Sequence, residues 1–230
     1  MERQVITMEF IYSLIFVYTI IPNIYYRFFS RAVLRRAYVR EKILALTFDD
    51  GPDPEYTPAL LNVLKEYDVK GTFFVLAKKA AQYPDLIRRM VSEGRNVGLH
   101  SFRHINEAFM SPHQTKKELY KSLSILNDLN VTTNVFRPPW GIFNLLTCHY
   151  AALCNCKIVL WSMHALDWSK YATVDSISNR LINNTRPGDI ILLHDGGGAK
   201  GAPGRTIAAL EVSLPVLKGK GYRFVLAKDI

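Results

Sequence analysis

The chain has 230 residues, of which 49% are hydrophobic, enough for a single enzyme-sized domain with one core. It carries 29 Lys and Arg residues against 20 Asp and Glu residues, which gives a formal net charge of +9. The sequence contains no recognised nucleic-acid-binding motif, internal repeat or low-complexity tract. We therefore expect no nucleic-acid partner and no repeat architecture.

The first predicted element is an apolar helix. Residues 10–26 are uncharged and rich in Ile, Phe and Tyr. A helix of this length spans about 25 Å, short of the roughly 30 Å hydrocarbon core of a bilayer, and Pro22 interrupts it. We interpret residues 1–40 as a membrane-anchor segment, single-pass or interfacial, with a helix packed on the rest of the chain as the alternative. The basic residues at 27–42 suit an anionic membrane surface.

From residue 41 onward, apolar runs with strand character alternate with amphipathic helices. We predict strands near 44–48, 71–76, 157–161, 190–193 and 222–226, and helices near 57–67, 84–92, from 111 onward, 174–182 and 206–217. Nearly continuous apolar strands alternating with helices indicate a parallel sheet covered by helices. We expect residues 41–230 to form one α/β domain.

Two adjacent carboxylates, Asp49 and Asp50, follow the strand predicted at 44–48. Neighbouring negative charges repel each other, and a metal ion or an arginine that neutralises them makes the pair tolerable. An Asp-Asp-Gly sequence is also a good turn. The pair alone therefore leaves both interpretations open.

His100 and His104 follow a segment, 94–99, that reads as a helix stop, a turn and a short strand. Two imidazoles four residues apart can face the same way on a helical turn and share one metal ion, but ordinary surface or capping histidines have this spacing too. Together with a carboxylate from another strand end, they would complete the ligand set of an open catalytic metal site.

Three later segments place further polar groups near strand ends. Two prolines after Arg137 hold it stiffly, which suits a bidentate contact with a carboxylate, although a solvated arginine in a proline-rich connector is the alternative. The apolar run 158–160 leads into 161–168, a loop in which a tryptophan packs on the core or lines a site. The run 190–193 delivers His194 at its end, where an Asp-Gly turn is the plainer interpretation.

The three cysteines, Cys148, Cys154 and Cys156, do not form a paired framework. Cys154 and Cys156 near His149 are compatible with a metal site. Ordinary buried thiols are the interpretation we favour.

Taken in order, the five polar segments resemble the motifs of the polysaccharide deacetylase family, which carries the NodB-homology domain and is also known as carbohydrate esterase family 4. The matching segments are Thr-Phe-Asp-Asp-Gly at 47–51, His-Ser-x-x-His at 100–104, Arg-Pro-Pro-Trp-Gly at 137–141, Asp-Trp at 167–168 and Leu-Leu-His at 192–194. The resemblance covers about residues 42–230 and implies a distorted, incomplete (β/α) barrel. One departure is His164, which stands where the family usually has the first Asp of its fourth motif.

The resemblance implies a metal-dependent hydrolase that removes acetyl groups from N-acetylated sugars of peptidoglycan or a chitin-like glycan. We expect the protein to be a monomer. It places one divalent ion, Zn²⁺ or alternatively Co²⁺, on Asp50, His100 and His104. The resemblance also implies the remaining roles at matching positions. Asp49 would be the base, oriented by Arg137, and His194 the acid, held by Asp167. The N–H of Trp140 would be an oxyanion donor, and Trp168 and Leu192 would be walls of the acetyl pocket.

Two alternatives remain at this point. One is an amidase acting on a lipid-linked sugar or a small non-sugar amide, an interpretation to which the apolar N-terminal segment lends weight. The other is a glycan-binding relic without catalysis, prompted by His164. A polysaccharide substrate would place the catalytic domain outside the cytoplasm, whereas the basic residues after the apolar segment would favour the cytoplasmic side.

Overall fold

The structure is a computed structural model that describes residue 9 and residues 12–230. Within these residues, nine strands form one sheet, and every ladder between them is parallel. The order is β1-β6-β5-β4-β3-β2-β8-β7, and β9 pairs with the start of β2. The strands are β1 (Val33–Leu34), β2 (Ile43–Asp49), β3 (Thr72–Leu76), β4 (Asn96–Ser101), β5 (Val135–Phe136), β6 (Lys157–Val159), β7 (Met163–His164), β8 (Asp189–His194) and β9 (Arg223–Phe224).

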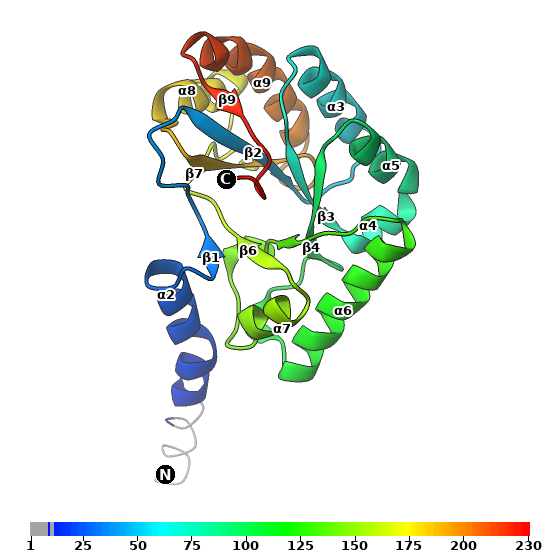
Figure 1. Cartoon of the computed structure of the whole chain (residues 1–230), viewed down its shortest axis with the longest axis vertical. Coiled ribbons are helices and arrows are strands. Elements are labelled where there is room, and N and C mark those ends of the chain that lie inside the picture. The colour runs from blue at the N-terminus through cyan, green and yellow to red at the C-terminus, as the bar shows by residue number, and fades with distance from the viewer. Residues whose placement is uncertain (1–8, 10–11) are drawn as a thin grey trace.

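Helices connect the strands and surround the sheet on its outer side (Figure 1). They are the π-helix η1 (Phe16–Ile20), α2 (Ile21–Phe28), α3 (Tyr56–Glu66), α4 (Ala77–Gln82), α5 (Pro84–Ser92), the 3₁₀ turn η2 (Glu107–Phe109), α6 (Pro112–Asp128), the 3₁₀ turn η3 (Pro139–Gly141), α7 (Thr147–Leu153), α8 (Val174–Asn184) and α9 (Ala202–Gly219). The curved sheet runs from β1 to β7 and stays open. The predicted incomplete (β/α) barrel is therefore confirmed.

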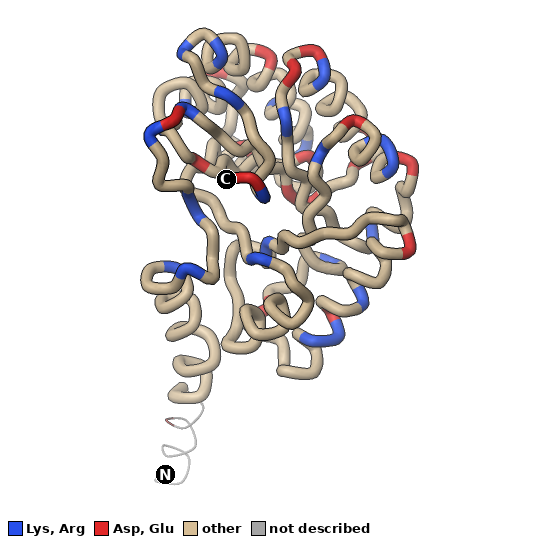
Figure 2. The backbone as a smooth tube through the Cα atoms, viewed as in Figure 1, with Lys and Arg blue, Asp and Glu red and all other residues tan. Residues whose placement is uncertain are grey.

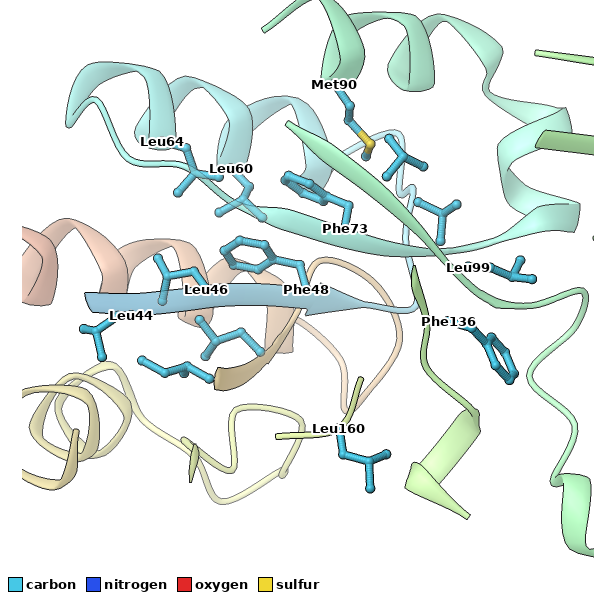
Figure 3. Packing of buried hydrophobic residues seen from close by; sticks show 14 of the residues in the cluster. Leu44, Leu46, Phe48, Leu60, Leu64, Phe73, Met90, Leu99, Phe136 and Leu160 are labelled. Carbon is cyan, nitrogen blue, oxygen red and sulfur yellow. The ribbon is translucent and has the colours of Figure 1, made fainter. Parts of the chain in front are cut away.

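Strand β2 shows how the sequence separates the two faces of the sheet. Leu44, Leu46 and Phe48 belong to the main hydrophobic core between the sheet and its helices, where Phe48 stacks on Phe73 (Figure 3). The alternate residues point into the barrel, where Ala45 belongs to a second, smaller cluster. Because side chains of a strand alternate between its faces, the same alternation turns Asp49 inward.

Most predicted boundaries agree with the structure to within one or two residues. The helix expected from residue 111 begins at Pro112, and Ser111 caps it in a capping box with Gln114. The helix expected at 206–217 is longer: it begins at Ala202, directly after Gly201, and ends at Gly219. The final strand is shorter than expected, and the short elements α4, α7, β1, β5 and β7 were not predicted.

The sheet begins before the boundary expected at residue 41. Strand β1 pairs with β6, and Arg36 forms an antiparallel bridge with Asp189 as well as an ion pair with its carboxylate. The segment between the N-terminal helix and β2 is thus part of the barrel wall.

The N-terminal helical segment does not have the form expected of a membrane-spanning helix. No charged residue interrupts it between residues 12 and 26, as Figure 2 shows. Even so, none of the helices in the described part of the chain has both the length and the apolar character needed to cross a bilayer. This finding overturns our expectation of a membrane-associated protein with residues 10–26 as its anchor, of which residues 10 and 11 lie outside the described residues. The N-terminal helical run is also irregular, because Phe16–Ile20 is π-helical and Pro22 lies in the first turn of α2.

The cysteines are free thiols, as predicted. Cys148 and Cys156 are buried, and burial raises their pKa values to about 12 and about 11. Thiols with such high pKa values stay protonated at neutral pH and are poor metal ligands and nucleophiles.

Candidate active site

The structure brings the predicted site residues together at one edge of the sheet. Asp49 is the last residue of β2, His100 lies near the end of β4 and His194 is the last residue of β8. Asp49 and His194 are direct neighbours in the β2–β8 ladder. Because the carboxyl ends of parallel strands lie side by side, segments far apart in the sequence converge here.

Asp50, His100 and His104 form a compact cluster. One ligand atom from each residue lies within 4.8 Å of the other two. Asp50 Oδ1 is 3.5 Å from His100 Nε2 and 3.3 Å from His104 Nε2. Two imidazoles and a carboxylate in this arrangement can hold one transition-metal ion and leave positions for water and substrate.

Two features of the cluster fit a metal ion. Asp50 Oδ1 is buried but accepts no hydrogen bond from any residue that the structure describes. His100 Nδ1 lies 2.7 Å from the carbonyl oxygen of Arg137, which can only accept, so Nδ1 carries the proton and Nε2 presents its lone pair to the cluster. Burial lowers the pKa of His100 to about 3, which keeps the ring in the neutral form that binds metals.

His104 reaches the cluster through a turn, not through the helical turn that its spacing suggested. His100 belongs to β4, whereas His104 follows the strand with a φ of 59°. The backbone N–H of His104 donates to Ser101 Oγ at 2.8 Å, which fixes the turn. The side chain of His104 then leans against the ring of Trp140, with 4.1 Å between ring centroids.

A second tight turn holds Asp50. Its φ is 72°, and the next residue, Gly51, has no room for a side chain, because a Cβ would lie 2.1 Å from Asp195 Oδ2. Asp195 is buried and accepts a hydrogen bond from Thr57 Oγ1 at 2.6 Å, while Lys79 Nζ donates to the carbonyl oxygen of Asp50 at 2.8 Å. Burial raises the pKa of Asp195 to about 7. We did not predict Asp195 or Lys79, although Asp195 directly follows the histidine of the fifth motif.

Asp49 lies beside the metal-ligand cluster and is only 3% exposed. Arg137 Nη1 donates to Asp49 Oδ1 and to Thr47 Oγ1, both at 2.7 Å. Arg137 is itself fully buried, and its other nitrogens donate to the carbonyl oxygens of Val159 and Leu160. Burial raises the pKa of Asp49, and the Arg137 guanidinium opposes that rise. The result is an oriented carboxylate suited to accepting a proton.

His194 lines the pocket next to Asp49, its partner in the β2–β8 ladder. Its Nδ1 is 3.1 Å from Asp167 Oδ1, and its backbone N–H donates to Asp167 Oδ2 at 2.8 Å. Asp167 is fully buried and also accepts a hydrogen bond from Thr206 Oγ1. Burial lowers the pKa of His194, but the hydrogen bond and charge of Asp167 outweigh it and raise that pKa to about 9. At neutral pH the ring is a cation with Nε2–H free for a substrate.

These groups line a pocket of about 490 Å³. Its lining residues are Asp49, Asp50, His100, His104, Trp140, Trp161, Trp168, Leu192, His194 and Gly198. Arg137 and Asp167 are the predicted site residues that lie beneath this surface. Trp161 and Gly198 were not predicted to line it, because an indole after a buried strand is equally typical of core packing.

His164, the departure from the family pattern, lies beside Trp168, which lines the pocket. It is exposed at the end of β7, and its ring centroid is 5.6 Å from that of Trp168. Burial and, after it, the nearby Arg180 lower the pKa of His164. The substitution leaves the Asp167–His194 pair in place.

The comparisons with known proteins agree with this site. Residues 36–159 match the polysaccharide deacetylase family model, and the chain belongs to the polysaccharide deacetylase family. A peptidoglycan-N-acetylglucosamine deacetylase of Bacillus cereus is 36% identical over 192 residues, which cover 83% of this chain and 88% of that protein. The crystal structure of a peptidoglycan N-acetylglucosamine deacetylase superimposes with a TM-score of 0.81 at 35% identity, covering 86% of this chain and 92% of the other.

A third similar protein warns against equating the fold with activity. It is a carbohydrate esterase family 4 pseudoenzyme from Bacillus anthracis, with a TM-score of 0.79 at 26% identity, covering 87% of this chain and 69% of that one. The side chains at the site, and not the barrel, must therefore carry any conclusion about catalysis.

Proposed function

We propose that this protein is a metal-dependent N-deacetylase that removes acetyl groups from N-acetylglucosamine residues of a peptidoglycan-type glycan. The observation that carries the proposal is that the Asp50–His100–His104 cluster shares one pocket with a buried, Arg-paired carboxylate, Asp49, and a cationic histidine, His194. The similarity to the Bacillus cereus deacetylase supports the choice of sugar.

Amide hydrolysis needs an activated water, a stabilised oxyanion and a protonated leaving amine. A divalent ion such as Zn²⁺ on the three-residue cluster would polarise the acetyl carbonyl and lower the pKa of water. Asp49 accepts the proton of the attacking water, and Arg137 keeps its carboxylate turned toward the pocket.

His194 donates the proton that the amine needs as it leaves. Its Nδ1–H is engaged by Asp167, so the proton transferred is the one on Nε2. The backbone N–H of Trp140 stabilises the developing oxyanion. Trp168 and Leu192 line the pocket, and in this proposal they bound the part of it that receives the acetyl methyl.

A second candidate is an inactive glycan-binding protein. Two observations favour it: His164 replaces an aspartate of the family pattern, and a pseudoenzyme shares the fold. Against it, Arg137 hydrogen-bonds to the proposed base, Asp49, and Asp167 contacts the proposed acid, His194, as the proposed catalysis requires.

Release of acetate decides between the two candidates. The purified full chain, loaded with Zn²⁺, is incubated with peptidoglycan and with N-acetylglucosamine oligomers, with and without a chelator. We expect acetate release that the chelator abolishes and added Zn²⁺ restores. Binding of either glycan by the metal-loaded protein without acetate release would refute the deacetylase and favour the binding protein.

A further inference from the structure

The loop that carries Trp140 is held by the N-terminal helical segment. In this segment, residues 18–19, 22–23 and 26–27 recur at intervals of four and lie on one face of the helix. They are buried or half-buried, whereas residues 12–17, 20–21 and 24–25 are exposed. The face turned toward the domain is therefore the one with the polar side chains, the reverse of an ordinary amphipathic helix.

The polar face makes specific hydrogen bonds to the loop. Arg27 Nη2 donates to the carbonyl oxygen of Gly141 at 2.6 Å. The carboxamide of Asn23 pairs with both backbone groups of Phe143, donating to its carbonyl oxygen and accepting from its N–H. The backbone N–H of Leu145 donates to the carbonyl oxygen of Tyr18 at 2.8 Å. Gly141, Phe143 and Leu145 of the loop thus each form a hydrogen bond with the N-terminal helix.

The same helix also anchors the loop that follows the second histidine of the cluster. Tyr18 Oη donates to the carbonyl oxygen of Met110 at 3.0 Å. Between the two loops, the ring of His104 meets the ring of Trp140. A shift of the helix would therefore move the two walls of the pocket that carry His104 and Trp140.

The backbone around Trp140 requires such support. Trp140 has a φ of 55°, and Gly141 follows with a φ of 64°. A left-handed conformation is unfavourable for a tryptophan and persists only when surrounding contacts enforce it. The bonds from Arg27 and Asn23 begin at the residue directly after Trp140.

We propose that Arg27 and Asn23 are positioning residues that hold the Trp140 loop in its active conformation, so that the N-terminal helix is part of the catalytic unit. The catalytic half of this inference rests on the proposed function, which uses the N–H of Trp140 for the oxyanion. The structural half, that these two side chains immobilise residues 138–146, stands independently of any activity.

The experiment combines hydrogen–deuterium exchange with steady-state kinetics on the full chain. The variants are Arg27→Ala, Arg27→Lys and Asn23→Ala. The matched control is Arg31→Ala, because Arg31 is exposed and its side chain makes no hydrogen bond with the residues that the structure describes. Thermal unfolding and bound metal are measured for each variant.

We expect amides of residues 138–146 to exchange at least several-fold faster in Arg27→Ala and Asn23→Ala than in the control. Turnover should fall roughly ten- to a hundredfold with little change in KM, because misplacing an oxyanion donor affects the transition state more than the bound substrate. Arg27→Lys keeps a donor and should recover part of both effects.

Unchanged loop exchange in Arg27→Ala and Asn23→Ala would overturn the inference, whatever happens to turnover. Faster exchange with turnover equal to that of Arg31→Ala would overturn its catalytic half. If the wild-type protein releases no acetate, the proposed function fails, and the exchange data alone decide whether the helix holds the loop.

Discussion

Replacing Asp167 with asparagine tests the assignment of His194 as the acid. The substitution preserves the shape of the side chain and an oxygen that can accept from His194 Nδ1–H, but it removes the buried negative charge. In the folded protein, the hydrogen bond and charge of Asp167 are the main contributions that raise the pKa of His194 against the effect of burial. Without the charge of Asp167, burial is opposed only by Asp49, Asp50 and the remaining neutral hydrogen bond, so the pKa of His194 should fall toward its ordinary value of 6.5.

The size of the effect follows from the two pKa values. The cation of His194 is the active form, so lowering its pKa moves the alkaline limb of the rate profile to lower pH. At pH 8, about nine-tenths of the ring is protonated when the pKa is about 9, but only about 3% when it is 6.5. Turnover at pH 8 should therefore fall by up to about thirtyfold from protonation alone, and much less at pH 6.

The assay is the pH dependence of kcat/KM between pH 5 and 10 on a soluble N-acetylated oligosaccharide, at saturating Zn²⁺. Asp175→Asn is the matched control, because Asp175 is exposed in the first turn of α8 and lies outside the pocket. An alkaline limb that stays at the wild-type position in Asp167→Asn would refute the reasoning, since the titrating acid would then not be the histidine paired with Asp167.

The remaining predictions concern the metal ligands, the base and the buried arginine. His100→Ala and His104→Ala should each reduce the metal bound per chain in protein purified without chelator, and an unchanged metal content would contradict the ligand assignment. Asp49→Asn should keep its metal but lose roughly two to four powers of ten in turnover, so near-wild-type activity would exclude Asp49 as the base. Arg137→Met should lower the free energy of unfolding in urea by about 3–5 kcal/mol, because Asp49 would be left buried without its partner. The double variant with Asp49→Asn should regain part of that loss, and equal destabilisation in both backgrounds would show that the ion pair is not the cause.

The strands and the residues at their ends could be predicted because their signals are local. A run such as Leu44 to Phe48 can hardly be anything but a buried strand, and a parallel sheet brings its carboxyl ends to one edge. That rule places Asp49, Asp50 and His194 at one edge of the sheet, whereas the roles expected for them came from the family resemblance. The fold also explains why the weakest local signals, such as the two-residue strands β5 and β7, were missed, since their pairing comes from neighbours distant in sequence.

The hydrogen bonds that hold the site residues in place could not be predicted, because they are made with backbone atoms or with side chains distant in the sequence. Arg137 donates to the backbone carbonyl oxygens of Val159 and Leu160. Any residue at those two positions would offer the same oxygens, so the sequence does not mark them as partners of Arg137. Asp195 and Thr57 lie 138 residues apart and meet only through the β2–β8 pairing. The hydroxyl of Thr206, which steadies Asp167, comes from the first turns of α9, a helix whose start was itself placed too late.

The N-terminal segment shows where composition misleads. An uncharged run rich in Ile, Phe and Tyr is typical of a membrane helix and equally of a helix packed on its own domain. The position of the few polar groups distinguishes these two kinds of helix. In this segment, Tyr18, Asn23 and Arg27 recur at spacings of five and four and lie on one face. In a lipid-facing helix, polar groups on one face would mark a helix–helix contact. Here they bond to the loops around the pocket, which is why removing this segment should disturb the site, although none of the groups proposed for catalysis lies in it.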